Sequence, residues 1–321
     1  MRRRAFLAGA VAGPLVSRLA WAASADYPNR PITLLVPSTP GGVVDFVARL
    51  MQPSLVDALG QSVIVENRPG GGGHLGAGLA AKSPADGYTL LCSAGSILVS
   101  GVYPDLSYDP MKDLTPVCRL TAGGFLLLVK ADSPYKTLGD LIEHGRNNPG
   151  KLFYASSSVG NSTHIGAEML SHMTGMKAMH VPYKGNMQAL TDLIGGRVDF
   201  MLDSRPSALP QVQAGTLRIL AVTSPDRAPD LPDTPSIAET VPGYGIEGWT
   251  GFFVRSGTAP SIVQRLAQAL ADGTREERVI SGIASTQSTV AYLGPEQAAA
   301  YMREDHARLS KVVRETGISS S

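Results

Sequence analysis

The sequence predicts an α/β protein of two lobes, each a mostly parallel β-sheet flanked by helices, with a cleft between the lobes. Short apolar runs of strand length alternate with stretches whose apolar residues recur at helical spacing, the order typical of β-α-β units. The chain has 321 residues, about the size of two ordinary domains. Apolar residues make up 43% and charged residues 17%, enough for large cores and too little charge for a disordered chain.

The first third of the chain contains one set of strands and helices. Gly41-Gly42 opens a helix that carries Val43, Val47 and Leu50 on one face. The other elements predicted in this set are strands at 32–36, 63–65 and 89–92, a glycine-rich turn at 67–73 and a helix at 75–82.

A second set of elements follows. Thr137 caps a helix, with Asp140 three residues later as in a variant of the capping box. Ile165 and Met169 mark another helix. Strands are predicted at 125–129, 152–155, 179–181, 198–202 and 217–222, with a further helix at 187–194.

The last part of the chain predicts a return to the first lobe. It contains a strand at 249–254, a helix that begins at Pro260 and a terminal helix that begins at Pro295. One long sheet does not accommodate this order easily, whereas two lobes do. We therefore predict a first domain of residues 26–122 plus 247–321 and a second domain of residues 123–246.

The first 22 residues have the pattern of an export signal. Arg2-Arg3-Arg4 precedes a mildly apolar stretch that ends at Ala20-Trp21-Ala22, an A-x-A cleavage pattern. The order Arg3-Arg4-x-Phe6-Leu7 predicts a twin-arginine signal for residues 1–22. Its removal takes away four arginines and no acid, so the formal net charge falls from +1 to about −3. A slightly acidic protein argues against a nucleic-acid partner.

The sequence predicts neither a metal site nor a cofactor. Cys92 and Cys118 lie in separate apolar strands and are expected to be buried free thiols, a disulfide between them being the alternative. No cysteine–histidine cluster has the spacing of a zinc site. Gly71-x-Gly73-x-x-Gly76 matches the dinucleotide fingerprint, but residues 91–100 contain no acid to bind a ribose.

Three loops are candidates for a ligand site. Residues 37–42 and 156–163 each follow an apolar strand and precede a helix, and residues 93–96, with Ser93 and Ser96, have the same composition. Backbone N–H groups at a helix N-terminus bind a carboxylate without lysine or arginine. Each loop taken alone is better explained as a capped turn between a strand and a helix. Three of them at the carboxyl edge of the strands favour a ligand site.

Motifs in these loops resemble a known family. Residues 37–49 read Pro-x-x-Pro-Gly-Gly-x-x-Asp-x-x-Ala-Arg, which is similar to the opening motif of the solute receptors of tripartite tricarboxylate transporters, the Bug family. The resemblance continues in family order over nearly the whole chain after the signal. Further motifs are Glu66-Asn67-Arg68-Pro69-Gly70-Gly71-Gly72, Pro84-Ala85-Asp86-Gly87-Tyr88-Thr89-Leu90, Val181-Pro182-Tyr183-Lys184-Gly185 and Gly248-Trp249-Thr250-Gly251.

The resemblance implies a periplasmic, type II-like binding protein whose lobes close on a small organic carboxylate. Two membrane subunits of a tripartite transporter would receive the ligand, and we expect the binding protein to be a monomer. The carboxylate class stays open: mono-, di- or tricarboxylate, aromatic acid or acidic amino acid. Ligand contacts carried over from the family fall on Pro40, Gly41, Gly42, Ser157, Gly160, Ser162 and Thr163, with Asp203 nearby.

Two further residues have alternative interpretations. Asp45 either orients the first loop or contacts the ligand, or it is a first-turn acid that favours the helix dipole. His164 either contacts the ligand or caps and packs. A ligand-dependent sensor that docks on a sensor kinase is a rival function. A hydrolytic enzyme using Ser162, His164 and Asp203 is another, although the first two side chains point differently off one helix start.

Overall fold

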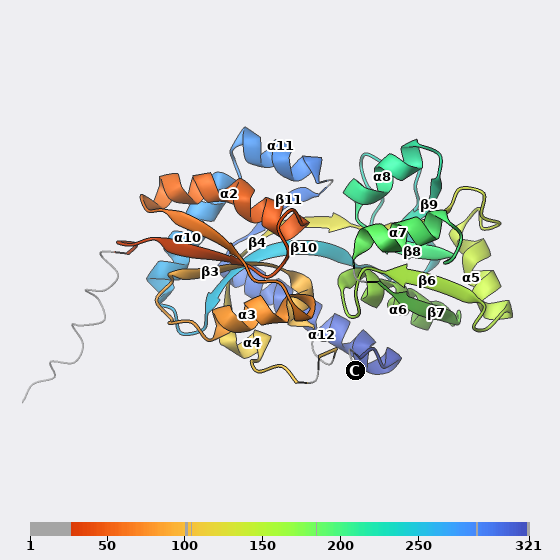
Figure 1. Cartoon of the computed structure of the whole chain (residues 1–321), viewed down its shortest axis with the longest axis horizontal. Helices are drawn as coiled ribbons and strands as arrows, with labels where there is room; N and C mark the ends of the chain where they lie inside the picture. Colours follow the sequence, from red (N-terminus) through yellow and green to blue (C-terminus); the bar gives the residue numbers. More distant parts are fainter. Residues whose placement is uncertain (1–26, 100–101, 104, 184, 287, 320–321) are drawn as a thin grey trace, which may run out of the picture.

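The computed structural model describes residues 27–99, 102–103, 105–183, 185–286 and 288–319. Residues 1–22, where the export signal is predicted, lie outside the described residues. Within the described ranges, no helix is both long enough and apolar enough to cross a membrane. The chain forms two β-sheets that lie side by side, each flanked by helices (Figure 1). This confirms the prediction of an α/β protein with two lobes.

The first lobe contains a six-stranded sheet. Its strands are β1 (Ile32–Val36), β2 (Val63–Asn67), β3 (Thr89–Ala94), β4 (Leu114–Gly124), β10 (Glu247–Arg255) and β11 (Thr289–Leu293). They lie in the order β11-β4-β10-β3-β1-β2. Strands β2, β1 and β3 run parallel, whereas β10 is antiparallel to β3 and to β4, and β11 is antiparallel to β4.

The second lobe contains a five-stranded sheet. Its strands are β5 (Leu126–Lys130), β6 (Leu152–Ser156), β7 (Ala178–Pro182), β8 (Phe200–Asp203) and β9 (Leu217–Val222). They lie in the order β7-β6-β8-β5-β9. Strands β7, β6 and β8 run parallel, and β5 is antiparallel to both of its neighbours.

Both sheets are therefore mixed, where the sequence predicted mostly parallel ones. Parallel neighbours need a crossover connection, usually a helix, and β1, β2, β6 and β7 are each followed by one. Strand β4 carries the chain out of the first lobe and β10 carries it back, so these adjacent strands run in opposite directions. Apolar periodicity shows that a strand exists but not its direction, which is why the prediction missed these pairs.

Helices cover both faces of the first sheet (Figure 1). One face carries α2 (Val43–Leu59), α10 (Pro260–Gly273) and α11 (Glu277–Ser285). The other carries α3 (His74–Ala81), α4 (Pro110–Asp113) and the first half of α12 (Pro295–Thr316). Met51 of α2 and Leu266 of α10 are fully buried in the first core, as the helical spacing of the apolar residues requires.

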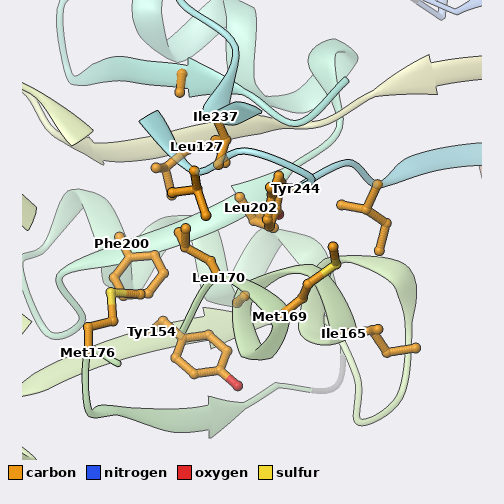
Figure 2. Close-up of a cluster of buried hydrophobic side chains, with 14 of the residues drawn as sticks. Leu127, Tyr154, Ile165, Met169, Leu170, Met176, Phe200, Leu202, Ile237 and Tyr244 are labelled. Carbon is orange, nitrogen blue, oxygen red and sulfur yellow. The ribbon is translucent and has the colours of Figure 1, made fainter. Parts of the chain in front are cut away.

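The second sheet is covered in the same way. On one face lie α5 (Leu138–Asn147), α6 (Ser162–Thr174) and α9 (Ile237–Thr240), and on the other α7 (Asn186–Ile194) and α8 (Arg205–Gln213). Figure 2 shows the larger core, in which Tyr154, Leu170 and Phe200 are completely buried.

Helix α12 joins the two lobes. Ala298 and Met302 in its first half pack into the first lobe, whereas Leu309 and Val313 pack into the core of the second. Val102, which follows β3 in sequence, also belongs to the second lobe's core. The predicted domain bounds, 26–122 plus 247–321 and 123–246, stay a prediction.

The two cysteines are free and buried, as predicted. Phe252 of β10 pairs with Cys92 of β3 on one side and with Cys118 of β4 on the other. Neighbouring strands lie about 4.8 Å apart, which puts the two cysteine Cα atoms roughly 10 Å from each other. A disulfide requires Cα atoms within about 7 Å, so the register of the sheet excludes one here.

Candidate functional site

A cleft of about 580 Å³ lies between the two sheets. The first lobe contributes Gly41, Gly42, Val43, Val44, Ala94, Ser96, Thr286 and Ser288 to its walls. Strands β4 and β10 contribute Thr121, Gly123, Gly124, Gly248, Trp249 and Thr250. The second lobe contributes Phe125, Ser157, Asn161, Ser162, Thr163, Asn186, Met187, Asp203, Ser204, Arg205, Pro206 and Ser207.

Four helices begin at this cleft: α2 from the first lobe and α6, α7 and α8 from the second. The capping residues of α2 and α7 are Gly42 and Gly185, which have no side chain to accept the first N–H groups. Ser204, at the start of α8, makes no side-chain cap either. Each helix N-terminus carries roughly half a positive charge and unpaired donors. The cleft is therefore suited to an anion.

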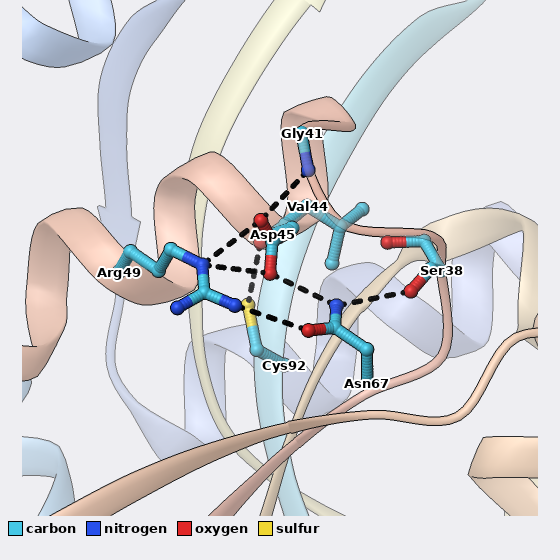
Figure 3. A network of polar contacts seen from close by, with 7 residues as sticks. All are labelled: Ser38, Gly41, Val44, Asp45, Arg49, Asn67 and Cys92. Atoms are coloured by element: carbon cyan, nitrogen blue, oxygen red, sulfur yellow. Dashed lines mark hydrogen bonds and ion pairs between the residues drawn. The ribbon is translucent and has the colours of Figure 1, made fainter.

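The first loop is held in shape from beneath by Asp45 (Figure 3). The Gly41 N–H donates to Asp45 Oδ2 at 2.9 Å, and Asn67 Nδ2 donates to Asp45 Oδ1 at 2.9 Å and to the Ser38 carbonyl at 3.0 Å. Arg49 Nε pairs with the same carboxylate at 3.0 Å. Gly41 has φ +83°, a conformation that favours glycine.

Asp45 itself is only 3% exposed and is not part of the cleft wall. Burial acts to raise the pKa of its carboxyl, but hydrogen bonds from Arg49, Gly41 and Asn67 outweigh burial, and the pKa is lowered. Asp45 is thus ionised at neutral pH and orients the first loop, one of the alternatives that the sequence left open.

The second loop reaches the cleft through Ser157, Ser162 and Thr163. Asn161 organises it: its Nδ2 donates to Ser157 Oγ at 2.7 Å, and its Oδ1 accepts the N–H of His164 at 2.8 Å. Neither Gly160 nor His164 lies in the cleft wall. The Gly160 N–H donates to His164 Nδ1 at 2.9 Å, so the buried His164 side chain contacts the loop backbone away from the cleft.

Asp203 connects the starts of α7 and α8. Its Oδ2 accepts from Asn186 Nδ2 at 3.1 Å and from Ser207 Oγ at 2.8 Å, and its Oδ1 accepts the Ser204 N–H at 2.6 Å. The side chain is buried, and burial raises its pKa despite these hydrogen bonds. Asp203 lines the cleft and fixes the orientation of the Asn186 amide and the Ser207 hydroxyl, which belong to residues that also line it.

Of the remaining predicted ligand contacts, one lines the cleft and two do not. Ser96 lines the cleft, whereas Ser93 is 1% exposed and lies behind the wall, opposite Gly251 in the sheet. Pro40 is exposed, but it is not among the residues that form the wall. Of the twelve predicted residues, seven line the cleft: Gly41, Gly42, Ser96, Ser157, Ser162, Thr163 and Asp203. Their contact with a ligand stays a prediction.

Several cleft residues were missed by the sequence reasoning. They include Thr121, Phe125, Trp249 and Thr250, which lie where the lobes join. Trp249 is only 4% exposed and its Nε1 donates to Asp305 on α12 at 2.9 Å, yet the residue also borders the cleft. The motif Gly248-Trp249-Thr250-Gly251 carried the signal, because two glycines around a large ring indicate close backbone approach.

The proposed hydrolytic set is not assembled. The Nδ1 atom of His164 already accepts the Gly160 N–H, and both oxygens of Asp203 are bonded to Asn186, Ser204 and Ser207. A nucleophile–base–acid relay needs these groups to be bonded to one another. Ser162, His164 and Asp203 therefore do not form one.

Comparisons with known proteins identify the family. A model described as tripartite tricarboxylate transporter family receptor matches residues 47–318. The chain belongs to this family. The protein BugT of Bordetella pertussis (strain Tohama I) is 34% identical to this receptor over 299 residues, which are 92% of each chain. The Bug resemblance is thereby confirmed.

Solved structures of relatives agree with the fold of the receptor. An R. palustris protein, Rpa4515, solved with adipate, is 36% identical, has a TM-score of 0.81, and the match covers 91% of this chain and 99% of that one. MatC from Rhodopseudomonas palustris, solved with bound malate, is 30% identical, has a TM-score of 0.77, and the match covers 89% of this chain and all of that one.

Proposed function

We propose that this receptor captures a small organic carboxylate in the periplasm, within the cleft between its lobes, and delivers it to the two membrane subunits of a tripartite transporter. The observation that carries the proposal is the convergence of helix N-termini from both lobes on one cleft. Donors on opposite walls reach the same anion only when the lobes are close together. A carboxylate that bridges them therefore favours the closed arrangement.

The chemistry of the walls supports binding rather than catalysis. Two charged side chains of the wall are engaged with neighbours, Asp203 with Asn186 and Ser207 and Arg205 with Asp230. The other polar groups are hydroxyls, amides and backbone N–H groups, which orient a carboxylate without reacting with it. The two relatives solved with adipate and with malate hold small carboxylates. We infer that the first carboxylate of the ligand lies between the starts of α2 and α6, and that the rest points toward α7, α8 and Trp249.

The first experiment is a thermal-unfolding screen of the exported form against adipate, malate, citrate, benzoate and glutamate. A ligand at 100 times its dissociation constant adds about 2.7 kcal/mol. For lobes of this size that raises the Tm by roughly 5–10 °C. A protein that arrives empty, as judged by mass spectrometry, and that responds to no acid would overturn the proposal.

A variant of the first loop tests where the ligand binds. Gly42 lines the cleft with an ordinary φ of −74°, and a Cβ there would have no neighbour closer than 3.5 Å. Gly42→Leu should therefore fold normally and weaken binding of the screened acid at least tenfold by filling the site. Gly139→Leu, on the exposed surface of α5, is the matched control. Equal affinities for the two variants would place the ligand elsewhere.

Delivery needs its own measurement. Uptake of the labelled acid by vesicles that contain the membrane subunits should depend on the receptor and fail with Gly42→Leu. Receptor-independent uptake would contradict the delivery role while leaving the binding role intact.

A further inference from the structure

The loops at residues 37–42 and 156–163 share a hydrogen-bonding arrangement that could not be predicted from the sequence. In each, a glycine with positive φ lies just before the capping residue, Gly41 at +83° and Gly160 at +72°. In each, the N–H of that glycine donates to the side chain four residues later, in the first helical turn, at 2.9 Å. The acceptor is Asp45 in the first lobe and His164 in the second.

The hydrogen bonds fix the chemical state of His164. Because the Gly160 N–H is a donor, Nδ1 of His164 must keep its lone pair, and the ring proton is on Nε2. The ring is 4% exposed and stacks on His180 with centroids 3.7 Å apart and an angle of 16° between the planes. Burial and the neighbouring His180 lower the pKa of His164 to about 3.

His180 completes the support on the other side of the loop. The Ser156 hydroxyl donates to the Ser158 carbonyl at 3.0 Å and also lies 2.6 Å from His180 Nε2. A hydroxyl has one proton, so His180 Nε2 must be the donor in the second contact. Burial lowers the pKa of His180 to about 4. The paired rings thus contact the loop at Gly160 and at Ser156.

The surroundings keep this pair neutral. Tyr154 of β6 stacks on His180 with centroids 4.9 Å apart, and its hydroxyl donates to Glu168 of α6. Burial raises the pKa of Glu168, and its carboxyl accepts a hydrogen bond from Tyr154. Tyr154, which is fully buried, also belongs to the core drawn in Figure 2.

We propose that His164, held by its stacked partner His180, is a positioning residue that fixes the carboxylate-binding loop of the second lobe in its binding geometry. This rests on the proposed function, since the loop is taken to hold the carboxylate. Neither ring lines the cleft. Their role is to hold Gly160 so that Ser157, Ser162 and Thr163 present their donors before the ligand arrives, which lowers the entropic cost of binding.

The test compares two substitutions of the same size. In His164→Asn the amide oxygen stands where Nδ1 stood and can accept the Gly160 N–H, whereas His164→Leu removes the acceptor. We expect His164→Leu to weaken binding about tenfold, the value of one lost hydrogen bond, and His164→Asn to remain within about threefold of the native protein. The probes are adipate and malate. His172→Leu, on the exposed side of the same helix, is the control.

Amide exchange of Gly160, followed by NMR without ligand, supplies a second readout. Exchange should be fast in His164→Leu and slow in His164→Asn and in the native protein. The proposal is overturned if both variants bind equally well, or if Gly160 exchanges at the same rate in both. Because this readout needs no ligand, it separates failure of the positioning role from failure of carboxylate binding, in which the native protein would bind no probe.

A measurement on the native protein covers the case in which His164→Leu does not fold. The ¹⁵N shifts of the imidazole should show His164 with an unprotonated Nδ1 and a protonated Nε2 at pH 7. The opposite tautomer, or a charged ring, would contradict the Gly160 contact and with it the proposal.

Discussion

Replacing Asp45 by asparagine tests whether the Asp45 side chain holds the first loop, residues 37–42, in its observed conformation. Each carboxylate oxygen now accepts a different donor, Oδ2 from the Gly41 N–H and Oδ1 from Asn67. An amide keeps one acceptor oxygen and turns an NH2 group toward the other donor, whichever way it is placed. One charge-assisted hydrogen bond is lost, and either Gly41 or Asn67 loses its contact with residue 45.

The expected cost is about 2 kcal/mol, within the range for a hydrogen bond to a charged acceptor. We discount the pairing with Arg49, because that side chain is 49% exposed and screened by solvent. For a protein of this size the Tm should fall by roughly 4–8 °C. Binding of the screened carboxylate should weaken several-fold, because Gly41 is no longer held.

The pH dependence follows from the lowered pKa of Asp45. A carboxyl whose folded pKa is depressed stabilises the fold above its unfolded pKa of about 3.9 and loses that effect as the pH falls through the folded value. The stability difference between the native protein and Asp45→Asn should therefore be constant from pH 5 to 8 and shrink only below about pH 3.9.

Asp57→Asn is the matched control, since Asp57 is an exposed acid on the same helix. Thermal unfolding measures the Tm of the two variants, and calorimetric titration measures their affinity for the screened carboxylate. If Asp45→Asn had the Tm and the affinity of Asp57→Asn, the bracing role of Asp45 would be wrong.

Two further substitutions probe the second lobe. Gly160→Ala places a Cβ 2.1 Å from Val102 Cγ1 at a positive φ, whereas Gly150→Ala has a similar φ and open space. In urea unfolding, Gly160→Ala should lose about 2 kcal/mol more of the free energy of unfolding than Gly150→Ala. Equal losses would show that Val102 moves aside at no cost. Burial raises the pKa of Asp203, so the native protein loses stability as the pH rises through that pKa and the carboxyl ionises. The difference in stability between the native protein and Asp203→Asn should therefore be smaller at pH 7 than at pH 4. A difference that does not change with pH, as expected for the exposed Asp132→Asn, would contradict burial as the cause.

The strands, the helices after them and the loops between them could be predicted from local sequence, because apolar periodicity and glycine-rich turns are local signals. The strand predicted at 32–36 is β1, and the loops that begin α2 and α6 do line the cleft. Helix α8 was missed because Pro206 and Pro210 interrupt its pattern, although Pro206 lies in the first turn, where the missing N–H costs nothing.

The region where the two lobes join could not be predicted from local sequence. Thr121 of β4 and Thr250 of β10 are paired across 129 positions of sequence, and both face the cleft only because these strands are neighbours in the sheet. Helix α12 reads as an ordinary amphipathic helix, and nothing in its spacing indicates that Met302 and Leu309 belong to different cores. Long-range pairing decides both features.

The proposed attraction of the cleft for anions requires that its two loops be held in a fixed conformation. Among the described residues of its wall, Arg205 is the one lysine or arginine, and its guanidinium is paired with Asp230. Attraction therefore depends on helix N-termini and neutral donors, whose effect falls off within one helical turn. A displacement of a loop by an ångström removes more binding energy here than it would beside a free cation. A buried acceptor under each loop, charged at Asp45 and neutral at His164, supplies the rigidity that such short-range donors require.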